Sequence, residues 1–357
     1  MTQKKTVKLK YVMTIPSVDF PGYAAINDLM LFGSGDPRYK DLKAQSPVLK
    51  KYLDSFRTPF GKKVNPSIIV RDQSLAKVDA PQLCAFRNAI AIGGVIGSRV
   101  MSCIQNETTG YYCSDLFDFH PVSVSSDGKD LIGKTPFETS GWLQVDNFVG
   151  QTTLTVIHPE MIRPANDKEL VLALLDVVEK KTRTSEEQRF KTRVVRSMEM
   201  VFYALKSPFA NLGEPVDFGV QIALWVSAFE ILANPHNARV GYKDVNKMIR
   251  SVPWENNKLR VKNRAGVGPL KGKRTTLPVQ IYGRLYKTRN AYIHGNAMRK
   301  GEYEFRKRKG WGSLFFQAPA LYRCFLIYLL NSKGFGELLK HSQYHALCEQ
   351  VLMSKGN

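Results

Sequence analysis

The sequence predicts an α+β domain over residues 1–165, followed by an all-α helical bundle over residues 166–357. In the first part, β-branched runs are separated by Gly, Pro, Asn and Asp, which is typical of short strands and turns. From Asp167 the apolar residues recur at helical spacing instead. Pro and polar residues between 159 and 167 mark the linker. A chain of 357 residues with 43% hydrophobic content can bury a core in each domain.

Three β-branched runs predict strands in the first domain, at 67–70, 121–124 and 152–157. The last run also alternates polar and apolar residues. Residues 83–104 are apolar enough for a helix or a strand pair, and their three glycines weaken both interpretations. Those glycines form neither a GxGxxG motif nor a P-loop, so they predict no nucleotide site.

Apolar positions three to four residues apart predict helices throughout the second domain. Their expected ranges are 168–181, 185–205, 216–233, 244–249, 277–293, 314–330 and 335–352. Ser185 and Gln188 have the spacing of an N-terminal cap for the second of these helices. Thr276 and Pro278 indicate where the helix over 277–293 begins, and Gly295 indicates where it stops.

The strongly basic balance predicts a polyanionic partner. The formal net charge is +21 and the isoelectric point is about 9.7, an excess that raises on-rates and non-specific affinity for phosphates. Between Glu255 and Gly312 there are sixteen Lys or Arg and three acids. This clustering suits an RNA-binding surface, and an anionic membrane surface is the competing polyanion.

Cysteine usage and the apolar runs indicate the compartment. The five cysteines are scattered, without CxxC spacing or a neighbouring His at ligand spacing, so we expect a reduced cytoplasm, no metal and no cofactor. Residues 1–10 are basic but lack the apolar core of a secretory signal. Residues 89–97 are too short to span a membrane, and Arg323 interrupts residues 314–330. A soluble, cytoplasmic protein that does not bind a membrane is therefore expected.

Residues 286–295 set a guanidinium, a carboxamide and an imidazole close together on the last turns of a predicted helix. Arg289 offers a planar fork of donors to phosphate oxygens, and His294 can pass a proton near neutral pH. Asn290 lies four residues before His294 and shares its face. Arg289 lies five residues before His294, which is about 140° around a straight helix. The side chains of Arg289 and His294 on one straight helix therefore do not reach the same phosphate. Either the end of the helix frays or a second copy of the motif takes part.

This pattern resembles the HEPN superfamily, whose ribonuclease members carry Arg, a polar residue, three or more others and then His on a late helix of a small bundle. The residues most similar to its Apea-like branch are Tyr286, Arg289, Asn290, His294 and Gly295. Residues 224–232 resemble an earlier helix of the family, in which an acidic residue, here Glu230, faces the Arg-His helix. The resemblance covers roughly residues 190–350. Residues 258–276 depart from it, because they are longer, more basic and richer in Gly than that connection in the family.

The resemblance implies a metal-independent endoribonuclease of the toxin or phage-defence class. In such enzymes the RNA 2′-hydroxyl attacks the adjacent phosphorus, leaving a 2′,3′-cyclic phosphate and a 5′-hydroxyl. His294 would move the proton, Arg289 would stabilise the phosphorane, and Asn290 would orient His294 or a phosphate oxygen. Glu230 would pair with Arg289 and fix its fork. Family members commonly build this site across a homodimer, so we expect one here.

Other partners follow from the same resemblance. An antitoxin or an activating ligand would keep such an enzyme under control, and residues 1–165 would be the sensor, by analogy alone. Further cations near the motif are candidates for RNA phosphate contacts, with Trp311 as a stacking ring. These cations are Lys271, Lys273, Arg274, Arg284, Lys287, Arg306, Lys307, Arg308 and Lys309.

Each candidate also has a structural interpretation. The basic runs suit a solvated surface. Glu230 suits the edge of its helix, pointing into water, and His294 taken alone suits a core histidine or a cation at a helix end. Tyr286, a supporting residue of the proposed site, and Tyr292 suit packing as well as base stacking.

Two other function classes remain open. A non-catalytic HEPN-like module would bind RNA or a partner protein through the same basic face. A DNA-binding protein would also fit the charge, although the sequence carries no helix-turn-helix or zinc-finger signature. Salt-sensitive RNA binding without cleavage favours the first class, and a preference for duplex DNA over single-stranded RNA favours the second.

Overall fold

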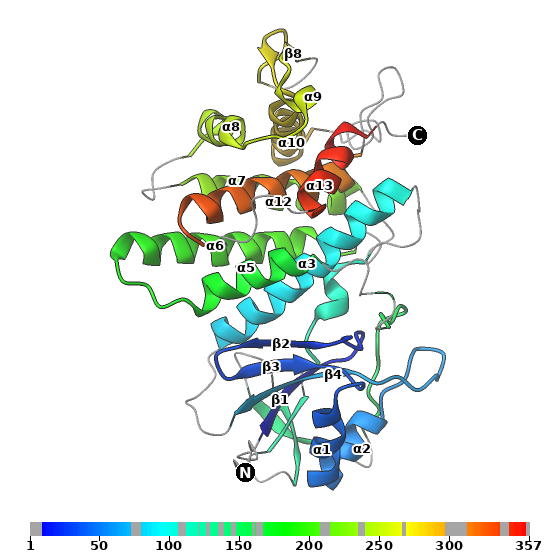
Figure 1. The fold of residues 1–357 in the computed structure, drawn as a ribbon. Helices are drawn as coiled ribbons and strands as arrows, with labels where there is room; N and C mark the ends of the chain where they lie inside the picture. The colour runs from blue at the N-terminus through cyan, green and yellow to red at the C-terminus, as the bar shows by residue number, and fades with distance from the viewer. Residues whose placement is uncertain are drawn as a thin grey trace. The chain divides into compact units, whose positions relative to one another are not determined.

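The computed structural model divides the chain into two compact units (Figure 1). The residues that it describes are 9–72, 80–105, 112–120, 122–125, 129–134, 139–143, 148–158, 161, 167–207, 215–234, 240–265, 269–296, 313–335 and 343–354. The first unit comprises Met1–Arg87 and Asp115–Ala165 and combines strands with helices; the second comprises Asn88–Ser114 and Asn166–Asn357 and is mostly helical. Residues 88–114, which the sequence assigned to the first domain, thus belong to the helical unit.

The larger sheet of the first unit has four antiparallel strands in the order β1-β4-β3-β2. Their bounds are β1 Leu9–Ile15, β2 Tyr23–Ile26, β3 Leu29–Phe32 and β4 Ser67–Asp72. Asn27 joins β2 to β3 in a tight turn with a φ of 49°, a left-handed conformation that Asn tolerates. Of these four strands, the sequence predicted only β4. β2 and β3 are four-residue strands of mostly Ala, Leu and Met, which carry little β-propensity. β1 carries Tyr, Val, Thr and Ile, a strand signal that the prediction missed.

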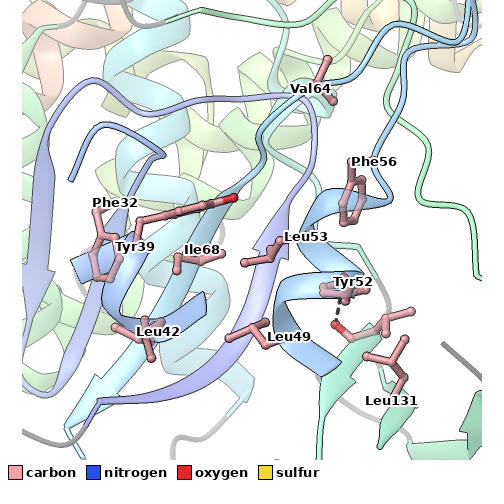
Figure 2. Packing of buried hydrophobic residues seen from close by; sticks show 12 residues of the cluster. Phe32, Tyr39, Leu42, Leu49, Tyr52, Leu53, Phe56, Val64, Ile68 and Leu131 are labelled. Carbon is pink, nitrogen blue, oxygen red and sulfur yellow. Dashed lines mark hydrogen bonds between the residues drawn. The ribbon is translucent and has the colours of Figure 1, made fainter. Parts of the chain in front are cut away.

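Two short helices, α1 Pro37–Gln45 and α2 Pro47–Asp54, pack on this sheet (Figure 1). Each begins with Pro after a capping side chain, Asp36 for α1 and Ser46 for α2. Their apolar residues meet those of the sheet in a single buried cluster (Figure 2). The labelled members of this cluster are Phe32, Tyr39, Leu42, Leu49, Tyr52, Leu53, Phe56, Val64, Ile68 and Leu131.

A smaller sheet has the order β5-β6-β7, with β5 Val122–Val124, β6 Leu131–Lys134 and β7 Thr139–Leu143. The strand predicted over 152–157 is wrong: within the described residues 148–158, only isolated bridges occur, at Gln151 and Ile157. Thr153 accounts for part of the difference. Its hydroxyl donates to the carbonyl of Thr155 at 2.7 Å, a local hydrogen bond that competes with regular strand pairing.

The apolar run over 83–104 lies within one helix, α3 Ala80–Gln105, so the strand-pair alternative is wrong. Gly93 has a packing role in this helix. A Cβ at Gly93 would lie 2.3 Å from Cγ2 of Val171, and the Gly93 carbonyl accepts a hydrogen bond from the backbone N–H of Asp167. The glycine therefore lets α3 approach the start of the next helix closely, rather than weakening α3.

The helices that follow agree with the apolar periodicity, with shifts at their ends. Their bounds are α5 Lys168–Glu179, α6 Ser185–Ala204, α7 Pro215–Ala233, α8 Tyr242–Ser251, α10 Leu277–Ile293, α12 Leu314–Ser332 and α13 Gln343–Met353. The cap of α6 lies one residue before the predicted Ser185: Thr184 accepts from the N–H of Glu187, whose side chain accepts in return. For the last predicted helix, residues 336–342 lie outside the described residues, and α13 begins at Gln343.

The segment between α8 and α10 contains a short helix, α9 Asn257–Arg260, and a hairpin of β8 Asn263–Arg264 and β9 Arg274–Thr275. The sequence predicted no element here. Strands of two residues carry no periodicity by which they can be recognised.

Buried aromatic rings and one buried ion pair hold the helical unit together. Phe229 of α7 packs on Tyr282 of α10 and on Tyr322 of α12, with ring centroids 5.3 and 5.6 Å apart. The Arg323 side chain is fully buried and donates to Asp167, Nε to Oδ2 at 2.7 Å. Helices α3 and α12 are long and apolar enough to cross a membrane, but 94% and 78% of their apolar windows are buried inside the structure.

Candidate functional site

Helix α10 carries the Arg-Asn-His segment and ends in a Schellman motif. The N–H of Asn296 donates to the carbonyl of Ala291 and the N–H of Gly295 to that of Tyr292, both at 3.0 Å. Gly295 has a φ of +70°, which favours glycine because it lacks a Cβ. His294 is the last residue before this reversal, with φ −86° and ψ 12°. The turn therefore places the imidazole at the end of the helix.

Arg289 and Glu230 form the ion pair that the sequence predicted. The Nη2 of Arg289 donates to Oε1 of Glu230 at 2.7 Å, and the two side chains are 20% and 22% exposed. This contact joins α10 to α7. Among the described residues no other hydrogen bond to the guanidinium is present, so its remaining donors face no protein acceptor there.

Glu230 is the charged residue on an otherwise apolar stretch of α7. Its neighbours Phe229 and Leu232 are buried, whereas Glu230 itself is partly exposed. Burial raises the pKa of Glu230, and the charge and hydrogen bond of Arg289 oppose that shift without cancelling it. The carboxylate is thus held at some cost in solvation, which is the expected situation for a positioning group at a functional site.

The ring of Tyr286 contacts the guanidinium, and two further tyrosine rings pack against Tyr286. The Cζ of Arg289 lies 4.8 Å from the ring centroid of Tyr286, a cation–π arrangement. Tyr286 contacts Tyr242 and Tyr282, with centroids 5.1 and 6.3 Å away. Tyr282 is fully buried, and its hydroxyl has no hydrogen-bond partner in the described part of the chain. Burial first, and the charge of Glu230 second, raise the pKa of that hydroxyl.

Tyr292 has a packing role. A Cβ at Gly219 of α7 would lie 2.1 Å from Cδ2 of the Tyr292 ring, so the ring lies directly on the backbone of α7. This contact allows α7 and α10 to approach closely on the side of the helix end. Tyr286 combines packing with the contact to Arg289, so packing accounts for both tyrosines.

The structure does not bring Arg289 and His294 together within one chain. The guanidinium lies over Tyr286, three residues earlier, and thus points back toward the start of α10. His294 lies beyond the last turn and is exposed, and its side chain makes no hydrogen bond to Arg289 or Asn290 among the described residues. Asn290 is half-buried, and its carbonyl accepts from the N–H of His294 at 3.1 Å. Neither Arg289 nor His294 is sealed inside the bundle.

The predicted RNA-contacting cations fall into two groups. Lys271, Lys273 and Arg274 are exposed on the hairpin before α10; Lys287 is exposed on α10 itself, and Arg284 is half-buried there. The remaining candidates lie outside the described residues. They are Arg306, Lys307, Arg308, Lys309 and Trp311.

Sequence reasoning missed other cations of the same hairpin. Lys258 and Arg260 on α9, and Lys262 and Arg264 at β8, are also exposed. The absence of any acid between Asn256 and Gly301 was the signal that would have found them.

Across the described residues, no group of three or more His, Cys, Asp or Glu side chains is arranged to hold a metal ion. All five cysteines are free thiols. No protein-family model, no curated protein and no solved structure matches the chain.

Proposed function

We propose that the helical unit is a HEPN-like domain and that the protein is a metal-independent endoribonuclease. The observation that carries this proposal is the end of α10, where an Arg held by a carboxylate from α7 and an exposed His both remain accessible. A phosphodiester needs a fixed cation for the charge that develops on its oxygens and a group that moves a proton. Arg289 and His294 supply these two functions.

The proposed reaction is internal transesterification of RNA. The 2′-hydroxyl oxygen bonds to the adjacent phosphorus while His294 takes its proton, and Arg289 neutralises the growing negative charge on the phosphoryl oxygens. The bond to the 5′-oxygen then breaks, and that oxygen leaves with the proton returned by His294. The products are a 2′,3′-cyclic phosphate and a 5′-hydroxyl. Asn290, one turn before His294, would orient the imidazole or a phosphate oxygen.

A second copy of the chain completes this site in the proposal. About 140° of helix rotation separates Arg289 from His294, and the guanidinium points toward the start of α10. With two α10 helices facing each other about a two-fold axis, Arg289 of one copy meets His294 of the other. Each dimer then holds two equivalent sites.

The decisive experiment is cleavage of total tRNA and rRNA by the purified protein in EDTA, with mapping of the cut ends. Cyclic-phosphate ends from the parent, and a loss of about a hundredfold or more in rate for His294→Ala and for Arg289→Ala, are expected. Cleavage by both variants at the parent rate would disprove the mechanism.

The second candidate is a non-catalytic module that binds RNA or a partner protein. The specific observation in its favour is that Glu230 already occupies Nη2 of Arg289, while His294 lies elsewhere on the same chain. Salt-sensitive RNA binding with intact RNA after long incubation would establish this candidate and exclude the first.

A further inference from the structure

The described residues of the range 257–275, which are 257–265 and 269–275, form a strongly charged projection from the helical unit, which we call the basic hairpin. It consists of α9, β8, β9 and the described residues around them (Figure 1). The cations exposed on it that form no ion pair within the described part of the chain are Lys258, Arg260, Lys262, Arg264, Lys271, Lys273 and Arg274. The sequence has no acid within this range. Nothing on the hairpin itself therefore neutralises these charges.

The strand register sets two of these cations directly opposite each other. Arg264 of β8 is the cross-strand partner of Arg274 of β9, which places their Cβ atoms about 4.5–5.5 Å apart. Like charges at this separation repel and oppose formation of the hairpin. A phosphate between the two guanidiniums reverses the sign of the interaction, because each Arg then has an anionic acceptor.

The hairpin keeps this arrangement because its base is anchored. The Nε2 of Gln280, a buried residue in the first turns of α10, donates to the carbonyls of Asn263 and Thr275 at 3.2 and 3.0 Å. These two residues are themselves cross-strand partners, so one side chain ties both strands to α10.

A second anchor holds the start of α9. The carboxylate of Glu349 on α13 accepts from the backbone N–H groups of Glu255 and Asn256 at 2.7 and 2.8 Å. Glu349 is buried, so α9 is fixed to the body of the helical unit.

The chemistry of the hairpin suits phosphates rather than bases. The sequence from Asn257 to Thr275 contains no aromatic residue, and stacking on aromatic rings is how proteins hold the bases of single strands. Base-paired stems keep their bases inside and present their phosphates outward. A pair of guanidiniums with flanking lysines matches that surface.

We propose, on the basis of the ribonuclease function above, that the basic hairpin binds the phosphate backbone of base-paired RNA. The Arg264–Arg274 pair holds one phosphate group, and Lys262, two residues before Arg264 and on the same face, adds a contact along the backbone. Gln280 hydrogen-bonds the hairpin to α10. An RNA stem bound to the hairpin is therefore held next to the helix that also carries Arg289. Binding is independent of base sequence.

The test uses full-length protein with His294→Ala, so that bound RNA stays intact whether or not the parent cleaves it. Arg264→Gln/Arg274→Gln is compared with Arg189→Gln/Arg196→Gln, which removes the same charge from exposed positions on α6. Affinity is measured by fluorescence anisotropy for a stem RNA, an unstructured oligouridylate, a DNA duplex of the same sequence and phosphatidylserine vesicles. Circular dichroism checks that each variant is folded.

The hairpin variant is expected to lose the one phosphate that the two arginines hold, which lowers the salt slope for the stem RNA by about 0.9. Between about 50 and about 200 mM NaCl, its affinity should therefore fall about three- to fourfold less than that of the background protein. The control variant should keep the background slope. An unchanged slope for the hairpin variant, a loss confined to the oligouridylate or to the vesicles, or tighter binding of the DNA duplex than of the stem RNA would each overturn the proposal.

Discussion

A mixture of two inactive variants should regain activity if one active site draws on two copies of the chain. Arg289→Ala keeps His294, and His294→Ala keeps Arg289. Within one chain the two groups are about 140° apart around α10, and the guanidinium is directed away from the helix end. Each variant alone should be inactive. Only a mixed dimer can combine an intact Arg with an intact His.

The expected size of the effect follows from counting sites. With random pairing at equal concentrations, about half of the dimers are mixed, and one of the two sites in each mixed dimer has both groups intact. The mixture should therefore show about a quarter of the parent activity per chain. A site built within one chain gives no activity from any pairing.

The assay is cleavage of a fluorescently labelled RNA in EDTA after the two variants have been mixed, denatured in urea and refolded together. Two affinity tags allow the mixed dimers to be isolated, after which about half of the parent activity is expected. Isolated mixed dimers without activity, or no dimers at all at concentrations where the parent cleaves RNA, would refute the shared site.

Three further predictions concern stability, each measured by urea unfolding. Gly295→Ala should cost about 1 kcal/mol because Ala resists the left-handed φ; Gly22→Ala, where a Cβ meets no atom within 4 Å, is the control, and equal losses would contradict this. Arg323→Met should cost about 3–5 kcal/mol because it leaves the Asp167 carboxylate buried without its cation; a loss below about 1 kcal/mol would argue against burial of the pair. Burial raises the pKa of Glu230 in the folded protein. Protonated Glu230 therefore stabilises the fold below its ordinary pKa of about 4.3, and this stabilisation is lost as the pH rises through the pKa of Glu230 in the folded protein. Glu230→Gln should not show this pH-dependent loss of stability. Parallel curves of unfolding free energy against pH for the parent and the variant would refute the prediction.

The two ends of α10 could be predicted from sequence because each has its own chemistry. Pro278 is favoured in the first turn of a helix, and Gly295 supplies the left-handed residue that closes it, so the predicted and observed ranges are both 277–293. The cap of α6 shows the limit of such signals. Thr184 and Ser185 both have a hydroxyl with an acid or amide three residues on, and only the backbone conformation selects Thr184.

The basic hairpin and the direction of Arg289 could not be predicted in the same way. Strands β8 and β9 have two residues each and depend on Gln280, a side chain from the following helix, for their anchor. Likewise, helical spacing predicts where the Cα of Arg289 lies, but Tyr286 and Glu230 together determine where its guanidinium points. Both features arise from contacts between elements, which local periodicity does not encode.

The ion pair with Glu230 bears directly on the choice between an enzyme and a binding module. A guanidinium has donors on three nitrogens, and Glu230 accepts from Nη2 alone among the described residues. The N–H groups of Nε and Nη1, which lie on different edges of the guanidinium, therefore remain for single contacts to phosphate while Glu230 still holds Arg289 in place. The carboxylate repels the phosphate but also limits the motion of Arg289, and a fixed cation loses less entropy when a transition state forms. Arg289 can thus bind a phosphate in its present position, and in the proposed site RNA cleavage depends on the His294 imidazole that a facing copy would bring.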